Sequence, residues 1–214
     1  MKTYEEIQAS ELSTWNISDI LIRQEKSQRE TCRYPMMAKQ MGLHYIDTSN
    51  MVVYDCGSGP LLGVSSVIPT KETVRVDPLA KEYAKYFDTQ TYITTQAEDL
   101  KERLSIPDLV IVTNALDHFE NPIHFLSQLV KYMRPGTFFS HYHAINNSLT
   151  HPHEAHQWNI NPEIVHSILD TDFETVWELK YPELRYGWVP YQGKVGQPAF
   201  CGLFRKTTGY ENSK

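Results

Sequence analysis

Glycines and acidic side chains at the ends of two apolar runs carry the clearest chemical signal in this sequence. Asp55, Gly57 and Gly59 follow one β-branched run, and Asp77 ends a second run 22 positions after Asp55 (77 − 55). Glycines let a backbone approach a ligand that any Cβ would keep away. A carboxylate at the end of the neighbouring strand can accept hydrogen bonds from ribose hydroxyls. The pattern predicts a nucleotide-type site, although a tight turn that binds nothing can also hold two glycines.

The same turn does not fit the common phosphate-binding patterns. A dinucleotide fingerprint, G-x-G-x-x-G, needs a third glycine where this chain has Leu62, and the D-x-G-x-G-x-G pattern needs one at Leu61. A G-x-x-x-x-G-K-[ST] phosphate loop is also missing from the sequence. The turn therefore favours a nucleoside over a pyrophosphate.

Asp117 and His118 form a second group that could do chemistry. They follow the apolar run 109–114, and a loop at the carboxyl end of a parallel strand lies in the ligand crevice of such sheets. His118 is a candidate general base because the pKa of histidine lies near working pH. Asp117 would fix its tautomer or bind the substrate. Alternatively, the His118 ring stacks near adenine or only orients the loop.

Histidines are concentrated in one later segment. Five fall within 16 positions, namely His141, His143, His151, His153 and His156. Strand alternation places the first two on one face. A lid over the substrate is the favoured interpretation, because long loops commonly carry function. An exposed loop without a role comes second, and a metal site with Glu154 comes third because the ligand spacing is not diagnostic. We therefore predict no metal.

Composition predicts an ordinary soluble domain. The chain has 214 residues, 41% of them hydrophobic and 21% charged, with a net charge of −6, which suits one globular unit. The acidic balance argues against a broad nucleic-acid-binding face. No apolar run approaches the ~20 residues of a membrane span, and the N-terminus lacks the apolar core of a signal peptide. Three scattered cysteines without a C-x-x-C pair predict a cytoplasmic location.

The elements that must position these residues alternate along the chain. We predict strands at 51–56, 73–77, 91–96, 109–114, 137–143, 175–181 and 199–206, and helices near 4–24, 35–41, 61–68, 79–87, 98–104, 121–133 and 161–170. Asn121-Pro122 and Asn161-Pro162 are typical helix starts, and Gly42 is a typical helix end. The alternation predicts a doubly wound α/β fold with a mostly parallel sheet. The last two strands have no helix between them, so we expect that pair to be antiparallel.

Five stretches resemble, in order, the motifs of class I (Rossmann-like) S-adenosylmethionine-dependent methyltransferases, and among these a bacterial small-molecule or sugar-type subgroup. The stretches are the turn at 55–59, V-R-V-D-P-L at 74–79, Q-A-E-D-L at 96–100, L-V-I-V-T-N-A-L-D-H at 109–118 and V-K-Y-M-R-P-G-T-F-F at 130–139. The resemblance covers roughly residues 40 to 206. It implies the strand order 3-2-1-4-5-7-6 and a helical cap at 1–45 over a domain at 46–208. The polar residues 209–214 are expected to form a frayed tail.

The resemblance also implies a cofactor, S-adenosyl-L-methionine (AdoMet), and a set of residues that bind it. The set is Asp55, Gly57, Ser58 and Gly59 around the methionine and ribose, Asp77 on the ribose hydroxyls, Pro78, Leu79, Ala97, Glu98 and Asp99 around adenine, and Asn114 and Ala115 under the sulfonium. Three of these have other interpretations. Asp55 could cap the next helix, Asp99 could be a solvated charge, and Asn114 could close a turn.

The residues predicted to contact the substrate come from a shorter resemblance. A-H-Q-W-N at 155–159 resembles a G-L-H-Q-W-N-type stretch of the same subgroup, which implies that His156, Gln157 and Trp158 face the active site. His156 is then a second candidate base, and Trp158 either forms a wall of the site or packs in the core. His143 completes the predicted substrate-facing set, within a lid at about 145–160.

The expected function is methyl transfer from AdoMet to a hydroxyl or amine of a small molecule, for example a sugar or sugar nucleotide. Three alternatives remain: a nucleic-acid methyltransferase, a non-methylating AdoMet- or nucleoside-binding protein, and an NAD-dependent oxidoreductase. The sequence has neither the basic tail nor the N-P-P-[YF] motif that would favour the first of these. No membrane partner is expected. An aromatic stretch at 184–191 could bind a substrate or a second copy of the chain in a homodimer.

Overall fold

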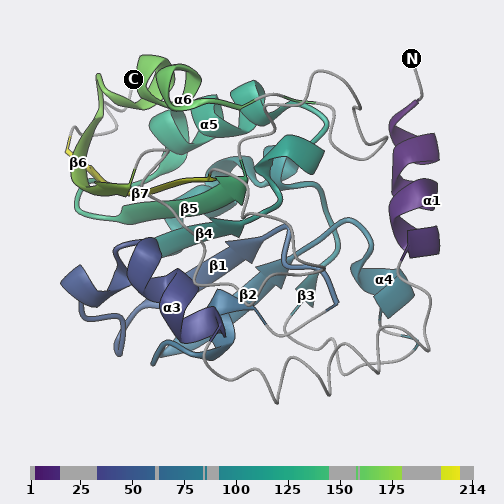
Figure 1. Cartoon of the computed structure of the whole chain (residues 1–214), viewed down its shortest axis with the longest axis horizontal. Helices are drawn as coiled ribbons and strands as arrows, with labels where there is room; N and C mark the ends of the chain where they lie inside the picture. The colour runs from purple at the N-terminus through teal and green to yellow at the C-terminus, as the bar shows by residue number, and fades with distance from the viewer. Residues whose placement is uncertain are drawn as a thin grey trace, which may run out of the picture.

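A seven-stranded sheet organises the chain (Figure 1). The computed structural model describes residues 3–14, 33–60, 63–83, 85, 92–144, 158, 160–179 and 199–207. The strands are β1 (Val52–Cys56), β2 (Glu72–Val76), β3 (Tyr92–Ile93), β4 (Leu109–Thr113), β5 (Phe138–Ala144), β6 (Phe173–Leu179) and β7 (Ala199–Lys206). They lie in the order β3-β2-β1-β4-β5-β7-β6. The first five are parallel, and β7 runs antiparallel to both β5 and β6, which confirms the predicted fold class, strand order and final antiparallel pair.

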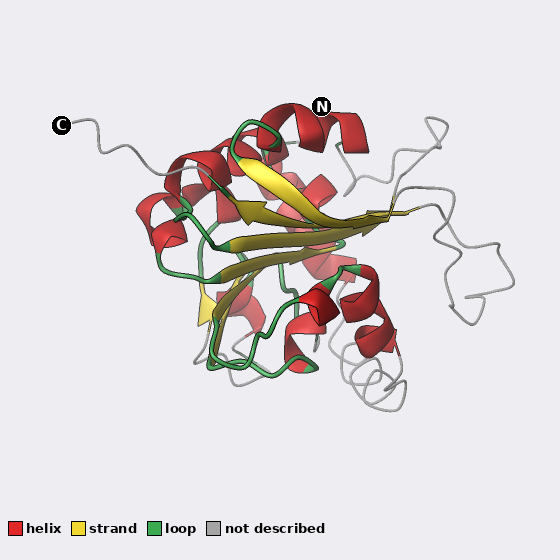
Figure 2. Cartoon of the chain, turned by 90° about the vertical axis from the view of Figure 1, so that its left-hand side faces the viewer, coloured by secondary structure: helices red, strands yellow, loops and turns green. Residues whose placement is uncertain are grey.

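Helices lie on both sides of the sheet (Figure 2). They are α1 (Tyr4–Thr14), α3 (Arg33–Gln40), α4 (Ala80–Tyr83), α5 (Pro122–Tyr132) and α6 (Pro162–Leu169). The connections also contain short 3₁₀ turns: η1 (Leu43–Tyr45), η2 (Val64–Ser66), η3 (Ala97–Asp99), η4 (Lys101–Ser105) and η5 (Leu116–His118). None of the helices in these described ranges has the length and apolarity needed to cross a bilayer.

Strand alternation divides the core into two layers. On β1, Tyr54 and Cys56 pack in the cluster beneath α5 and α6, whereas Val53 packs in the cluster beneath α3 and η1. Every strand residue from 109 to 112 is buried, as a strand covered on both faces requires. Burial on both faces fixes the strand ends in register and so fixes the loops at their carboxyl ends.

The predicted helix ends are confirmed. The Asn121 side chain accepts a hydrogen bond from the His124 N–H at 2.9 Å, and the Asn161 side chain accepts one from the Ile164 N–H at 2.9 Å. Each asparagine is followed by a proline in the first turn. Gly42, at φ 75°, lies in the left-handed region just after α3, a position that glycine occupies without strain.

The helix predicted near 61–68 is wrong for the described part of that range. Gly63 is extended (φ −114°, ψ −164°), and only the short turn η2 follows. The hydroxyl of Ser66 donates back to the Gly63 carbonyl at 2.6 Å, so a side chain satisfies a backbone acceptor that a helix would have used. The α-helix predicted at 98–104 is instead a pair of 3₁₀ turns. The strand predicted at 91–96 is shorter than expected and covers only Tyr92 and Ile93.

Aromatic rings fill the layer between β5, β7 and α6. His141 stacks on Phe139 with ring centroids 5.5 Å apart and on Phe204 with centroids 5.8 Å apart. Gly202 of β7 lies opposite His141 in the strand register. A Cβ at Gly202 would come within 2.4 Å of Cε2 of Phe204 and within 3.2 Å of Nε2 of His141. Only glycine leaves room for both rings.

Gly202→Ala should therefore destabilise the protein by about 1–3 kcal/mol, because the added methyl must displace a fully buried ring. Urea unfolding followed by far-UV circular dichroism measures the change. Gly63→Ala is the matched control, since its nearest atom would be a carboxylate oxygen of Asp55 at an ordinary 3.6 Å. Equal stability losses in the two variants would contradict the packing explanation.

Candidate functional site

The glycine turn after β1 lies where the order of successive strands in the sheet reverses. β1 and β4 are neighbours, but the strands that follow each of them in sequence are added on opposite sides, which makes this the switch point where open α/β sheets bind ligands. Gly57 and Gly59 both have positive φ, at 68° and 60°. A Cβ at Gly57 would come within 2.5 Å of the Ala115 Cβ, whereas one at Gly59 would meet no atom of the described residues within 4 Å. Gly57 therefore brings the two loops together, and Gly59 borders open space.

Asp77 connects the end of β2 to this turn. One carboxylate oxygen accepts from the Gly59 N–H at 2.9 Å, and the other accepts from the Leu79 N–H at 2.9 Å. The residue is only 6% exposed, and charge-assisted bonds of this kind are about twice as strong as neutral ones. Asp77, Gly57 and Gly59 are thus brought together as predicted, and Pro78 and Leu79 lie half-buried beside them.

Tyr92 supports the turn from β3 and was missed in the sequence. Its hydroxyl donates to the Gly59 carbonyl at 2.9 Å, and Arg75 donates to the Tyr92 oxygen at 3.1 Å. Gly59 is thus held through both its N–H and its carbonyl. The Ser58 hydroxyl oxygen beside it is buried without a hydrogen-bond partner in the described residues. A tyrosine in a short strand gives no sequence signal for such a role.

Asp55 faces the segment after the turn. It is 3% exposed, and its carboxylate accepts a hydrogen bond from the Ser65 hydroxyl of η2. Burial raises the pKa of this carboxyl, although the Ser65 bond and the charge of Arg75 act in the opposite direction. The alternative that Asp55 caps a helix does not hold for the described residues, because only η2 follows and Asp55 bonds to the Ser65 side chain within it.

The residues predicted around adenine have unequal surroundings. Glu98 is 6% exposed and accepts from the Asn121 N–H at 2.9 Å, so it holds the start of α5. Burial raises the pKa of the Glu98 carboxyl, despite that hydrogen bond. Ala97 is buried in the core, and Asp99 is exposed.

The loop after β4 carries the candidate base. Asn114 is exposed and left-handed, at φ 53°, and its N–H donates to the Tyr142 carbonyl at 2.6 Å. Asp117 is buried, and one of its carboxylate oxygens lies 3.8 Å from Nε2 of the partly buried His118. Ala115, buried against Gly57, fixes this loop beside the glycine turn. The predicted Asp117–His118 pair therefore lies next to the predicted cofactor turn.

Tyr4 of α1 is the second residue that sequence reasoning missed. In Figure 1, α1 stands beside the carboxyl ends of the central strands. Burial raises the pKa of the Tyr4 hydroxyl, and the nearby carboxylates of Glu98 and Asp77 raise it further. A capping box begins the helix, because the Thr3 N–H donates to Glu6 at 2.8 Å and the Glu6 N–H donates to Thr3 at 3.3 Å. That T-x-x-E pattern was the available signal.

The predicted substrate-facing residues are only partly described. His156, Gln157 and the histidines at 151 and 153 lie outside the described residues, as does the stretch at 184–191. Trp158 is half-buried against the core cluster beneath α5 and α6. His143 is 1% exposed, and its ring contacts His141 and the Ile160 carbonyl. His143 thus lies inside the protein layer and not on an open wall.

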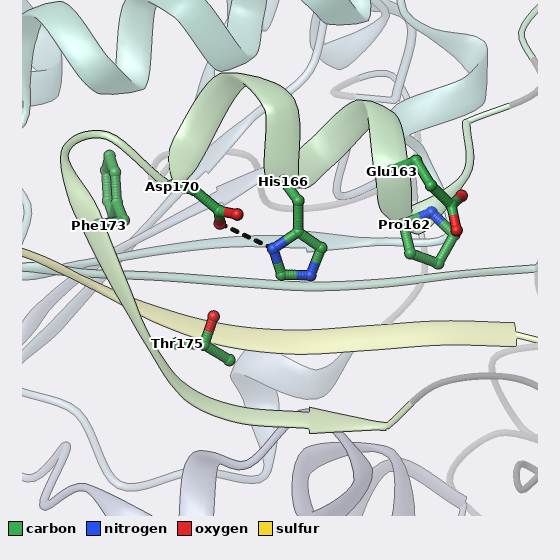
Figure 3. A pocket seen from close by; sticks show the side chains of 6 residues that line it. All are labelled: Pro162, Glu163, His166, Asp170, Phe173 and Thr175. Atoms are coloured by element: carbon green, nitrogen blue, oxygen red, sulfur yellow. Dashed lines mark hydrogen bonds and ion pairs between the residues drawn. The ribbon is translucent and has the colours of Figure 1, made fainter.

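A separate groove borders the edge strand β6 (Figure 3). It measures about 640 Å³ and is lined by Pro162, Glu163, His166, Asp170, Phe173 and Thr175. Both ring nitrogens of His166 contact carboxylates, Nδ1 with Asp170 at 2.7 Å and Nε2 with Glu178. Partial burial lowers the pKa of His166, but these bonds and charges outweigh it and raise the pKa. The strand order places this groove far from Asp77, so it is not part of the nucleoside site.

Comparison with known proteins identifies the fold. No family model and no curated protein matches the sequence. Among solved structures, a putative S-adenosylmethionine-dependent methyltransferase from Listeria monocytogenes aligns with 11% identity and a TM-score of 0.59, over 83% of this chain and all of that one. The 1,6-didemethyltoxoflavin-N1-methyltransferase of Burkholderia thailandensis, with S-adenosylhomocysteine bound, aligns with 15% identity and a TM-score of 0.57, over 97% and 92% of the two chains.

A third similar structure is the N-methyltransferase NodS of Bradyrhizobium japonicum WM9 in complex with S-adenosyl-L-homocysteine. It aligns with 16% identity and a TM-score of 0.56, over 84% of this chain and 88% of that one. At these identities the likeness establishes a shared fold. The chain therefore has the Rossmann-like fold found in these methyltransferases.

The burial of His141 makes the free energy of unfolding depend on pH. Burial holds the pKa of His141 well below its ordinary value, and the neighbouring His143 and His166 lower it further. Below about pH 6.5 the unfolded chain binds a proton at this residue and the folded chain does not, so stability is lost as pH falls. His141→Phe should reduce the loss of unfolding free energy between about pH 7 and pH 5 by roughly 2 kcal/mol.

Urea titrations at several pH values measure this dependence. Phe204→Leu serves as the control, since it also disturbs the fully buried ring stack but removes no titrating group. The control should lose stability similarly at every pH. A wild-type pH dependence in His141→Phe would show that His141 is not held neutral by folding.

Proposed function

We propose that the protein is an AdoMet-dependent methyltransferase that acts on a hydroxyl or amine of a small molecule. The observation that carries this proposal is the bond between Asp77 and the Gly59 N–H at the switch point of the sheet. It brings a carboxylate from the end of β2 to a glycine turn that borders open space. A nucleoside needs a site with both features.

The residues present fit an adenosyl group. A carboxylate can accept more than two hydrogen bonds, so Asp77 can hold the turn and ribose hydroxyls together. Ser58 provides a hydroxyl without a partner in the described part of the chain, and Gly59 leaves the space above it open. Tyr4 and α1 cover the side near Glu98, in keeping with the proposed cap at 1–45. Asn114 and Ala115 form the floor between the turn and the candidate base.

Bound AdoMet would supply a methyl group that is already activated by its positive sulfur. The protein then has to orient the acceptor, which can offset ~7–11 kcal/mol of the barrier, and remove a proton from it. His118 is the proposed base, with Asp117 beside it to stabilise the imidazolium that forms. His156 is the second candidate for this role, and Trp158 is proposed to border the acceptor.

Two of the similar structures support an amine acceptor, and one of these two supports a small molecule. Their names assign them N-methylation, one of them of 1,6-didemethyltoxoflavin, so an amine is a reasonable acceptor here. A sugar or sugar nucleotide of surface-polysaccharide or natural-product chemistry is the more specific proposal, and it rests on the sequence resemblance. We propose a cytoplasmic enzyme. Isotopic labelling from methyl-labelled AdoMet in a cytosolic extract, followed by mass spectrometry, would identify the product.

Calorimetric titration with AdoMet and with NAD tests the cofactor. We expect micromolar binding of AdoMet and none of NAD. Asp77→Ala should weaken AdoMet binding by about 1.5–3 kcal/mol, the range for a hydrogen bond to a charged group. Asp47→Ala is the control, because Asp47 is exposed before β1, at the other end of that strand. If Asp77→Ala binds AdoMet like wild type, the ribose assignment is wrong, and if NAD binds instead, the oxidoreductase alternative replaces the proposal.

His118→Ala should lower the methyl-transfer rate roughly 10²–10⁴-fold with little change in AdoMet affinity, the range expected for loss of a general base. His156→Ala gives the same result if that residue is the base. His124→Ala, on the exposed side of α5, should leave the rate unchanged. A loss of AdoMet affinity in His118→Ala would instead make His118 a cofactor contact.

A further inference from the structure

Two buried histidines on β5 have no role in the chemistry proposed above. His141 is 0% exposed and His143 is 1% exposed. Their rings stack with centroids 5.2 Å apart and an interplanar angle of 24°, and their Nδ1 atoms are 3.3 Å apart. Two polar rings in an aromatic layer are costly to bury unless their hydrogen bonds are satisfied. Their arrangement therefore requires a specific explanation.

The hydrogen bonds fix which nitrogen carries each proton. The Ile160 carbonyl can only accept, so Nε2 of His143, 2.9 Å away, must donate to it. A neutral imidazole has one donor and one acceptor, so Nδ1 of His143 accepts from Nδ1–H of His141. Nε2 of His141 is then an acceptor, and within the described residues it has no hydrogen-bond partner. The chain of donors runs in one direction and ends at Ile160.

The surroundings of the pair keep both rings neutral. Burial lowers the pKa of both histidines, although the Ile160 bond and the charge of Asp117 oppose this at His143. Asp117 faces the pair from η5, and His166 faces it from α6 between Asp170 and Glu178. β7 contributes aromatic rings, which carry no charge. A proton added to His143 would place two N–H groups against each other.

The recipient of this bond, Ile160, lies close in sequence to Trp158, which is proposed above to border the acceptor. Ile160 is 2% exposed, two residues after Trp158 and directly before Asn161, which caps α6. Trp158 packs partly buried against the core, and its indole N–H is buried without an acceptor in the part of the chain that the structure describes. Buried indole N–H groups usually have a partner. An oxygen or nitrogen of the bound acceptor would satisfy this one.

We propose that His143 is a positioning residue, which holds Trp158 at the methyl acceptor through its bond to the Ile160 carbonyl. This inference rests on the proposed function, since it assigns the indole N–H to the acceptor. The Ile160 carbonyl fixes the tautomer of His143, and His141 only donates to the Nδ1 atom that this leaves as an acceptor. His143 thus orients Trp158 from within the core and does not itself contact the acceptor.

Matched variants separate positioning from packing. His143→Gln keeps an amide donor at about the reach of Nε2, whereas His143→Asn is one methylene shorter. Both carry the same polar group in the same buried position. We expect His143→Asn to lower the transfer rate roughly tenfold to a hundredfold, a range seen when a reacting group is misplaced by about 1 Å. His143→Gln and His141→Phe should stay within about threefold of wild type, because each leaves a donor to Ile160.

The rate is measured with saturating methyl-labelled AdoMet and a bacterial cytosolic extract as the source of acceptor, and AdoMet affinity by calorimetry. Affinity should change less than about twofold in every variant, since β4 separates β5 from β1 and the nucleoside turn in the sheet. Equal rates for the Asn and Gln variants, or a loss in His141→Phe as large as in His143→Asn, would overturn the proposal.

Imidazole ¹⁵N chemical shifts of the wild type provide a test that does not depend on activity. We expect an Nε2–H tautomer for His143 and an Nδ1–H tautomer for His141, both neutral at pH 7. The opposite tautomers would refute the positioning scheme. Absence of AdoMet binding in the wild type would instead remove the proposed function, while the tautomers would still report on the hydrogen-bond chain.

Discussion

One charge-assisted hydrogen bond, from the Gly59 N–H to the Asp77 carboxylate, holds the candidate site together. It joins the loop after β1 to the end of β2, and the close approach of Gly57 to Ala115 joins the same loop to β4. Three loops from separate parts of the chain therefore occupy fixed relative positions. Because the strands beneath them are buried on both faces, the loops cannot move independently. A ligand at the switch point meets a preorganised surface.

Burial gives similar side chains different tasks around this site. Asp55 and Glu98 are as buried as Asp77, yet one contacts Ser65 and the other holds the N-terminus of α5 at Asn121. Asp77 differs because one of its partners is the backbone N–H of Gly59, within the glycine turn itself. The histidines follow the same principle. His118 lies partly exposed beside Asp117, whereas His141 and His143 are enclosed and held neutral.

The core and the candidate site are coupled through β5. Its buried face carries the aromatic stack around His141, and its carboxyl end carries His143 and its bond to Ile160. Gly202 on β7 leaves the room that this stack needs. The packing of β5 against β7 therefore determines where the chain leaves the strand and where it enters α6. A core substitution in this layer can in this way affect the position of Ile160 without contacting it.

The sequence alone was sufficient for the elements that local chemistry decides. Asn-Pro pairs begin α5 and α6, Gly42 follows α3, and apolar runs mark the central strands, because caps, left-handed glycines and alternation act over a few residues. It was insufficient where partners lie far apart. The segment after Gly59 looked helical, but Ser65 bonds to Asp55 instead. The surroundings of Tyr4, Tyr92 and His143 depend on groups far along the chain, which no short stretch of sequence encodes. These groups are Glu98 of η3 for Tyr4, Gly59 after β1 for Tyr92 and Ile160 before α6 for His143.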